Sequence, residues 1–263
     1  MGITIALAQM AIALGKPQEN HLTAQSLAAE AAAQHADLML LPELWATGYD
    51  LDRTSEYAAP LDRGHFALMS ELAQRHGLYV AGTALETNSS GRPFNTAALY
   101  GPNGNCVGAY RKVHLWAPLG EVEHMTPGKV LPAFDLPWGR VAMAICYDLR
   151  FPELWRRLAD AGADLILIPA EWPTRRVEHW RLLLRARAVE NQLYVAGCNR
   201  VGAGADGEFG GHSAVADPWA HVLAEGGSEP DLLVATIELD EVARARRLFP
   251  FLADRRPEVY NRK

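Results

Sequence analysis

The chain has 263 residues, of which 49% are hydrophobic, and its formal net charge is −6. This length and apolar fraction are enough to bury a substantial core, and no shift in composition marks a linker, so we expect one domain over residues 1–263. The acidic net charge argues against a nucleic-acid partner. Every apolar stretch is shorter than the roughly 20 residues that span a bilayer, and this argues against a membrane partner. No signal segment is visible before the first strand-like run, so we expect a cytoplasmic protein.

Strand-like and helix-like segments alternate along the chain. Strands are expected at residues 3–10, 37–41, 78–85, 95–100, 105–111, 140–145, 164–169, 193–198, 213–216 and 232–238. Helices rich in Ala or Leu are expected at residues 21–35, 65–76, 152–161 and 175–190. This alternation predicts a layered α/β fold.

The last of these helices has two distinct faces. The side expected to face the core carries Val177, Trp180, Leu183, Leu184 and Val189. The opposite side carries Glu178, Arg181 and Arg185, and this stripe is interpreted as a solvated face.

Three of the strand-like runs end on residues that can do chemistry. Glu43 follows the run at 37–41, Lys112 follows the run at 105–111, and Cys146 follows the run at 140–145. A side chain at a strand end meets the amide N–H groups of the following turn, which can hold an oxyanion or favour a thiolate. Taken singly, a free cysteine is most often a core residue and a charged residue a solvated strand terminus.

Taken in order, these residues resemble the Glu-Lys-Cys triad of the nitrilase, or carbon–nitrogen hydrolase, superfamily. The segments that carry the resemblance are 41–44, 95–97, 110–115, 119–121, 126–128, 145–153, 185–191 and 211–218. They cover the chain nearly from end to end. The resemblance implies a four-layer αββα sandwich, and it implies that two subunits pair into a homodimer or a higher homo-oligomer.

The resemblance also implies a mechanism for hydrolysing a small carboxamide. An amide carbonyl is a poor electrophile, so its hydrolysis needs an activated nucleophile, a stabilised oxyanion and a proton for departing ammonia. The family pattern makes Cys146 the nucleophile that forms a thioester and Glu43 the base. Lys112 and the backbone N–H after Cys146 would hold the oxyanion, and Glu121 would position Lys112 through a charge-assisted hydrogen bond. No cofactor is implied, and no Cys-x-x-Cys or His-Glu-x-x-His spacing indicates a metal.

The other cysteines and the histidines have ordinary interpretations. Cys106 and Cys198 lie in apolar runs and are expected to be small core residues. A Cys–His pair is the alternative for the base, with His114 and His212 nearest to the matched segments. The family pattern, however, already fills the position of the base with Glu43.

Several features favour the amide-cleaving branch of the superfamily. The nucleophile continues as Cys146-Tyr147-Asp148, whereas nitrile-cleaving members typically have Cys-Trp-Glu. Residues 170–173, 196–202 and 255–260 are similar to omega-amidases, which hydrolyse the terminal amide of 2-oxoglutaramate and related dicarboxylic monoamides. One departure is Ala220, which follows Pro218-Trp219 where many relatives have a glycine.

Residues near the matched segments are candidates for binding the substrate. Tyr147, Trp116 and Trp172 could line the pocket, and core packing is the rival explanation for each. The carboxylate of a dicarboxylic monoamide calls for a cationic group at the far end of the pocket. The candidates are Arg150, Arg175, Arg176 and Arg200. Arg175 and Arg176 are best placed to discriminate, because amide-cleaving relatives outside the omega-amidases share Arg150.

Two alternative functions stay open. One is another hydrolase of the same superfamily, acting on carbamoyl compounds, aliphatic amides or esters. The other is a non-catalytic binding protein on this fold, which the intact triad disfavours. The apolar residues within 246–252 additionally predict a surface that a second subunit covers.

Overall fold

The computed structural model describes residues 2–260 and, over that range, contains two six-stranded sheets and a small hairpin. The first sheet has the order β14-β1-β2-β3-β4-β5. Its strands are β1 (Gly2–Gln9), β2 (Leu38–Leu40), β3 (Tyr79–Glu86), β4 (Phe94–Tyr100), β5 (Cys106–Arg111) and β14 (Asp231–Glu238). The second sheet has the order β13-β12-β9-β8-β7-β6. Its strands are β6 (Ala133–Leu136), β7 (Gly139–Met143), β8 (Leu165–Ala170), β9 (Tyr194–Asn199), β12 (Ala214–Ala216) and β13 (Val222–Glu225).

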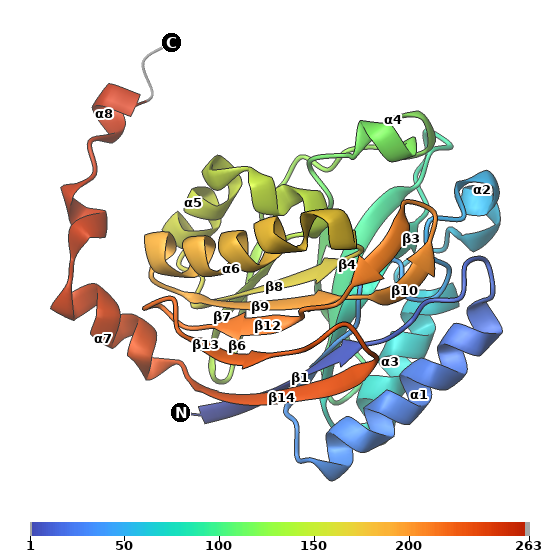
Figure 1. Ribbon diagram of the computed structural model, residues 1–263, viewed down its shortest axis with the longest axis horizontal. Helices are drawn as coiled ribbons and strands as arrows, with labels where there is room; N and C mark the ends of the chain where they lie inside the picture. Colours follow the sequence, from blue (N-terminus) through green and yellow to red (C-terminus); the bar gives the residue numbers. More distant parts are fainter. Residues whose placement is uncertain (1, 261–263) are drawn as a thin grey trace.

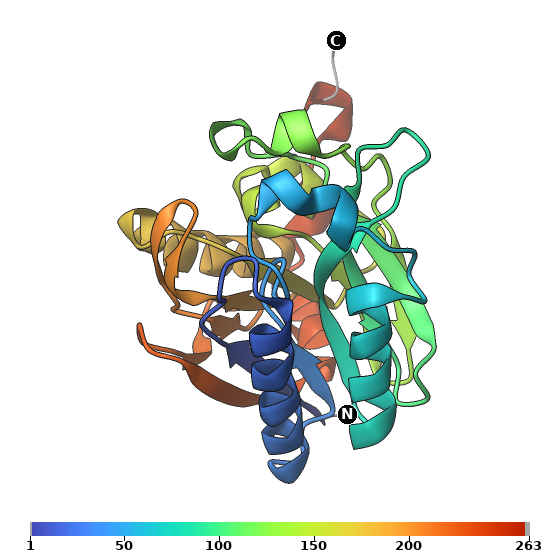
Figure 2. The ribbon, with the colours of Figure 1, turned by 90° about the vertical axis from the view of Figure 1, so that its right-hand side faces the viewer.

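The two sheets pack face to face, and helices cover their outer faces (Figure 1). One apolar core joins the inner faces of both sheets, for example Leu7 and Leu40 from the first and Leu167 from the second. Helices α1 (Pro17–Ala33) and α3 (Gly64–His76) run side by side over the first sheet (Figure 2). Helices α5 (Pro152–Asp160) and α6 (Val177–Asn191) cover the second sheet. The expected four-layer αββα sandwich is therefore confirmed.

Shorter elements join and extend these layers. They are α2 (Thr54–Tyr57), α4 (Glu121–His124), the hairpin of β10 (Val201–Gly204) and β11 (Gly207–Gly210), α7 (Asp240–Leu248) and α8 (Pro257–Tyr260). The segment with α7 and α8 leaves the body of the molecule and extends along one side of it (Figure 1). None of the helices within residues 2–260 is both long enough and apolar enough to cross a membrane.

All ten predicted strands and all four predicted helices are present, with ends that differ by a few residues. Two details of the prediction are wrong. Val189 is 39% exposed, because it lies on the side of α6 opposite the buried stripe that Trp180 and Leu184 define. Cys106 is exposed rather than in the core, because it begins β5 at the outer edge of the first sheet, whereas Cys198 is buried as expected.

Ala220 has a backbone conformation that glycine adopts more readily than alanine. It has a φ of +67°, in the left-handed region that a Cβ atom disfavours. The turn is closed by a hydrogen bond from the backbone N–H of Ala220 to the carbonyl of Asp217, 3.0 Å long. This strained turn lies between β12 and β13, at the outer edge of the second sheet, so it does not alter the site described below.

The strand directions bring several strand ends to one place. In the first sheet β2 is parallel to β3, and β5 has the same direction because two antiparallel pairings separate it from β3. In the second sheet β7, β8 and β9 are parallel. The residues that follow β2, β5, β7 and β8 are therefore free to meet between the sheets, since carboxyl ends of parallel strands lie at the same edge.

Candidate active site

Cys146 lies at a strained turn just after β7. Its φ is +42°, a left-handed conformation that is uncommon for a residue with a side chain. The 3₁₀ turn that begins at Cys146 leads into α5, and Cys146 is 8% exposed at the floor of a pocket. The thiol lies 3.7 Å from the carbonyl oxygen of Glu171, to which it donates. The sharp turn presents the sulfur to the pocket while the strand behind it stays buried.

Asp148 holds this turn in place. Its carboxylate accepts hydrogen bonds from the backbone N–H of Ile145 at 3.0 Å and from the hydroxyl of Tyr110 at 2.7 Å. It also binds the backbone N–H and the ring Nδ1 of His114, at 3.0 and 2.8 Å. Because Asp148 is fully buried and bound to three elements, its contacts fix the backbone on both sides of the nucleophile.

The two histidines nearest to the matched segments have partners other than Cys146. His114 pairs with Asp148 and stacks on Phe151 at 3.6 Å between ring centroids. His212 pairs with Glu225 at 2.9 Å. Neither hydrogen bond includes the Cys146 thiol, so the geometry gives no support to a Cys–His pair.

Glu43, Lys112 and Glu121 form a buried cluster beside the cysteine. Glu43 follows β2, Lys112 follows β5, and Glu121 begins α4. The ammonium of Lys112 donates to Glu43 Oε1 at 2.8 Å and to Glu121 Oε1 at 2.6 Å. The side chains of all three residues are fully buried in these pairs. Glu121 Oε2 also accepts the backbone N–H of Trp116 at 2.7 Å, which fixes the loop that carries Glu121.

Three residues that were not predicted as site residues complete the contacts of Glu43, although Asn95 and Glu171 lie in segments that carry the family resemblance. Its Oε1 accepts hydrogen bonds from the hydroxyl of Tyr49 at 2.6 Å and from the amide of Asn95 at 2.8 Å. Its Oε2 accepts the backbone N–H of Glu171 at 3.0 Å, and this bond joins the two sheets. Glu171 directly follows β8, so the pattern of a reactive residue after an apolar strand, which indicated Glu43, also indicates Glu171. Tyr49 lies in a turn, and no pattern in the sequence places its hydroxyl in the cluster.

Burial and the neighbouring charges determine which groups are charged. Burial raises the pKa of the Cys146 thiol well above its usual value, and the negative charge of Glu43 raises it further. Burial alone would lower the pKa of Lys112, but the charges of Glu121 and Glu43 outweigh it, and the pKa is raised. Burial also raises the pKa of Glu121 against the opposing charge of Lys112. The resting site therefore holds a neutral thiol beside a permanent ammonium.

A pocket of about 380 Å³, including its open mouth, leads to the thiol. Tyr147, Trp116 and Trp172 all line it, as their positions beside the matched segments suggested. The rings of Trp116 and Tyr147 meet edge to face at 4.6 Å between centroids. The aromatic walls suit an apolar middle portion of a small molecule.

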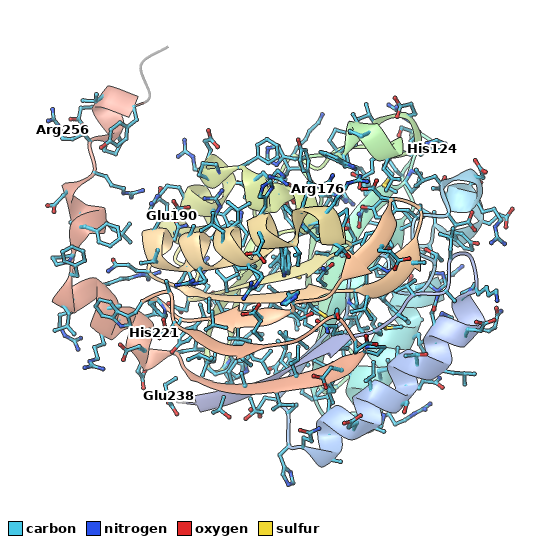
Figure 3. The ribbon with its side chains drawn as sticks, viewed as in Figure 1. His124, Arg176, Glu190, His221, Glu238 and Arg256 are labelled. Atoms are coloured by element: carbon cyan, nitrogen blue, oxygen red, sulfur yellow. The ribbon has the colours of Figure 1, made fainter. Side chains whose placement is uncertain are left out.

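Two of the four candidate arginines line this pocket. Arg150 lies over the ring of Trp172 at 4.6 Å, and Arg176 lies over the ring of Trp116 at 5.1 Å. Figure 3 labels Arg176 near the beginning of α6, on the same side of the molecule as His124 of α4. Arg176 donates to Asp206 at 3.1 Å, at the tip of the β10–β11 hairpin, and Asp206 also lines the pocket.

The other two arginines are not available to a ligand in this pocket. Arg175 pairs with Asp206 at 2.5 Å from the outside, and its side chain is 58% exposed. Arg200 is fully buried behind Glu171, which it binds at 2.9 Å, and its other donors bind the carbonyls of Ile12, Val201 and Ala203. Burial raises the pKa of Glu171 to about 7 against the charge of Arg200. The Oε1 atom of Glu171 is buried without a hydrogen-bond partner.

Comparisons with known proteins agree with this geometry. A family model described as carbon–nitrogen hydrolase matches residues 4–247. The chain belongs to the carbon–nitrogen hydrolase family. It is 39% identical to a 2-oxoglutaramate amidase of Bacillus subtilis (strain 168), over 98% of this chain and 99% of the other. It is 34% identical to the human protein named omega-amidase NIT2, over 97% of this chain and 96% of that protein.

A solved structure extends the comparison to a bound amide. A cysteine-to-alanine mutant of the amidase from Nesterenkonia sp. AN1, in complex with butyramide, superposes with a TM-score of 0.86 and 29% identity. The match covers 98% of this chain and 95% of that one. Together with the family match, these relatives make this carbon–nitrogen hydrolase an amide-hydrolysing enzyme that depends on a cysteine.

The cluster contains what such hydrolysis needs. A thiol, a carboxylate within its reach and a fixed ammonium lie at the ends of β7, β2 and β5. Within residues 2–260, no group of three or more His, Cys, Asp or Glu side chains is arranged to hold a metal ion. The chemistry that this arrangement supports is nucleophilic attack by sulfur with general acid–base assistance.

Proposed function

We propose that this hydrolase is an omega-amidase, which converts the terminal amide of a small dicarboxylic monoamide, such as 2-oxoglutaramate or succinamate, into a carboxylate and ammonia. The observation that carries the proposal is the pocket itself, which has the thiol at its buried end and the guanidinium groups of Arg150 and Arg176 in its wall. The similarity to a 2-oxoglutaramate amidase over nearly the whole chain supports it.

In the proposed mechanism Glu43 takes the proton of Cys146 as the sulfur attacks the amide carbon. A base is needed because the pKa of the buried thiol is raised, so little thiolate forms spontaneously. The negative charge that develops on the carbonyl oxygen is held by the Lys112 ammonium and by the backbone N–H of Tyr147. Glu43 then gives its proton to the leaving nitrogen, and ammonia departs from the thioester.

The second half of the cycle uses the same groups. Glu43 removes a proton from a water molecule, which attacks the thioester carbon, and the proton returns to the Cys146 sulfur as the carboxylate product forms. Glu121 keeps the Lys112 ammonium in position through the 2.6 Å contact. The residues proposed as catalytic are thus Glu43, Lys112, Glu121 and Cys146.

At the far end of the pocket, the carboxylate of the substrate would bind Arg176 and Arg150. Within residues 2–260 Arg150 forms no ion pair with a carboxylate, and its guanidinium is hydrogen-bonded to His179 and lies over the Trp172 ring. Arg176 shares Asp206 with Arg175, so part of its hydrogen-bonding capacity is free. A planar carboxylate can bind such a guanidinium through two parallel hydrogen bonds.

The second candidate function is hydrolysis of simple aliphatic amides. The aromatic walls of the pocket and the butyramide complex of the structurally similar amidase favour it. The test is to compare initial rates on succinamate and 2-oxoglutaramate with those on butyramide, N-carbamoyl-putrescine, a simple ester and a dinitrile. Turnover of the carboxylate-free compounds as efficient as that of the acid amides would reject the omega-amidase proposal and leave an amidase of broader specificity.

We further propose that the enzyme is a homodimer or a higher homo-oligomer. Leu248 and Phe249, at the end of α7, are each 59% exposed in a segment that leaves the body of the molecule (Figure 1). A second subunit would cover these side chains. Light scattering at micromolar concentration should return at least twice the 28.8 kDa mass of one chain, and a monomer would contradict the proposal.

A cytoplasmic location is also proposed. All three cysteines are free, as is usual in a reducing compartment. Cell fractionation with activity as the readout would test this.

A further inference from the structure

Tyr49 lies between two carboxyl groups that the mechanism above treats separately. It is 6% exposed, and its hydroxyl oxygen lies 2.6 Å from Glu43 Oε1. The same oxygen is hydrogen-bonded to Glu121 Oε1. The Lys112 ammonium donates to it as well, at 3.1 Å. Tyr49 is therefore in contact with each charged member of the cluster.

The number of protons in these contacts is limited. A phenol has one hydroxyl proton, so Tyr49 can donate to one carboxylate oxygen only. Its contact with the second carboxyl oxygen is favourable only if that carboxyl carries a proton, because two oxygens without a proton between them repel at such a distance. An ionised Tyr49 would have no proton to donate to either carboxyl group. Tyr49 also stays protonated, because burial and, after it, the charges of Glu121 and Glu43 raise the pKa of its hydroxyl well above its usual value.

The charge of the buried cluster leads to the same conclusion. Two ionised carboxylates and one ammonium, all with fully buried side chains, would leave one uncompensated negative charge. An unpaired buried charge is costly, and a carboxyl group usually avoids this cost by binding a proton. One extra proton makes the cluster of Glu43, Glu121 and Lys112 neutral beside the neutral Cys146 thiol.

We propose that Tyr49 couples Glu43 and Glu121 into one titrating unit that carries a single negative charge in the resting enzyme, with two protons, the hydroxyl proton of Tyr49 and one carboxyl proton, shared among the three oxygen atoms. This inference rests on the proposed function, because it specifies the state of its base. Tyr49 is a positioning residue: it does not react, and its hydroxyl adjusts the affinity of the coupled unit for a proton. The charged and titratable groups that face it are Glu43, Lys112, Glu121 and Cys146.

The unit has a consequence for the acidic limb of the rate profile. A hydroxyl that donates to a carboxylate stabilises the charged form, which keeps the base ionised at lower pH. The ascending limb of kcat/KM then reports one apparent pKa that belongs to the whole unit.

The test is Tyr49→Phe, which removes the hydroxyl and retains the ring. Because a hydrogen bond to a charged group is lost, the acidic limb of kcat/KM should move to higher pH by about one unit. At a pH within that limb, kcat/KM should fall about tenfold, whereas KM at high pH should change by less than about twofold. Glu171, whose backbone N–H binds Glu43, is present in both the wild-type enzyme and Tyr49→Phe. Its titration therefore contributes equally to the two pH profiles and does not affect the difference between them.

The matched control is Tyr100→Phe. Tyr100 is also buried, but its hydroxyl donates to the carbonyl of Leu61, outside the cluster. The acidic limb of the kcat/KM profile of Tyr100→Phe should therefore stay at the wild-type pH. A fixed limb in Tyr49→Phe, or an equal movement in both variants, would overturn the proposal, and amide hydrolysis by the wild-type enzyme would still support the proposed function.

A second measurement does not depend on the folding of Tyr49→Phe. Glu171→Gln removes the other buried carboxyl with a raised pKa, and the infrared spectrum of this variant at neutral pH should contain the carbonyl band of a neutral carboxylic acid. The band should disappear when Glu121→Gln is added. Absence of the band from Glu171→Gln would show that both carboxyls are ionised and would refute the shared proton.

Discussion

The two ends of the pocket are built differently. At the reacting end, the side chains of Glu43, Lys112 and Glu121 are fully buried, and contacts of 2.6 to 2.8 Å hold them. At the far end, Arg176 keeps 23% of its side chain exposed, and the single carboxylate of Asp206 serves both Arg175 and Arg176. The first arrangement is preorganised for one kind of chemistry, and the second can exchange partners at little cost. In the proposed function, reaction type therefore depends on the buried end and substrate choice on the outer end.

The largest effect should come from the nucleophile. Cys146→Ala should abolish turnover and leave the melting temperature nearly unchanged, because it removes the acyl acceptor and little packing. Cys106→Ala and Cys198→Ala should stay active. Since Cys106 is exposed, iodoacetamide inactivation should be followed in the Cys106→Ala background, with mass spectrometry locating the label. Inactivation with the label on Cys198 alone would contradict the assignment.

Next in size are the charges at the buried end. Lys112→Ala and Glu43→Gln should each lower kcat by at least about 10²–10³, the typical cost of losing one oxyanion donor. His114→Ala is the comparison, because His114 contacts Asp148 rather than the thiol. Near-normal rates in Glu43→Gln together with complete loss in His114→Ala would instead favour a Cys–His pair.

A smaller and more selective effect is expected at the outer end. Arg176→Gln should raise KM for succinamate about tenfold, which corresponds to the loss of a charge-assisted hydrogen bond of about 1.5 kcal/mol, and should leave KM for butyramide unchanged. Arg175→Gln is the matched control, since Arg175 has the same partner and lies outside the pocket wall. Equal effects of both variants would show that the charge acts at long range rather than by contact.

The smallest effect should have the opposite sign. Asp206 occupies part of the hydrogen-bonding capacity of Arg176, so a substrate carboxylate competes with it. Asp206→Asn should lower KM for succinamate about two- to threefold, because an exposed ion pair contributes under about 1 kcal/mol. Steady-state kinetics in parallel with butyramide would measure it, and a rise in KM for the acid amide would mean that Asp206 supports the site instead.

The contrast between the two ends also explains what the sequence could predict. Glu43, Lys112 and Cys146 follow apolar strands, and strands of one direction end at one edge, so local pattern and family resemblance both indicated them. Glu171 follows β8 in the same way and was within reach of that rule. Tyr49 and Asp206 lie in turns, and their contacts form only when segments distant in sequence meet, which periodicity does not report.

The limits of the fold prediction have a similar cause. Long apolar runs such as β8 and β9 are buried on both faces and are visible in the sequence. The four-residue strands β6 and β13 lie at the edges of the second sheet, where exposed residues mix with apolar ones and weaken the pattern. Helices α7 and α8 are mostly polar or exposed within this chain, so no core-facing stripe identified them.

Because the catalytic cluster is divided between the two sheets, turnover reports whether the sheets have docked against each other. Glu43 and Lys112 belong to the first sheet, and Cys146 and Glu171 to the second. The hydrogen bond from the Glu171 N–H to Glu43 forms only when the sheets are docked. During refolding, circular dichroism would therefore report strands as they form, whereas the return of catalysis would time the later moment at which the sheets come together.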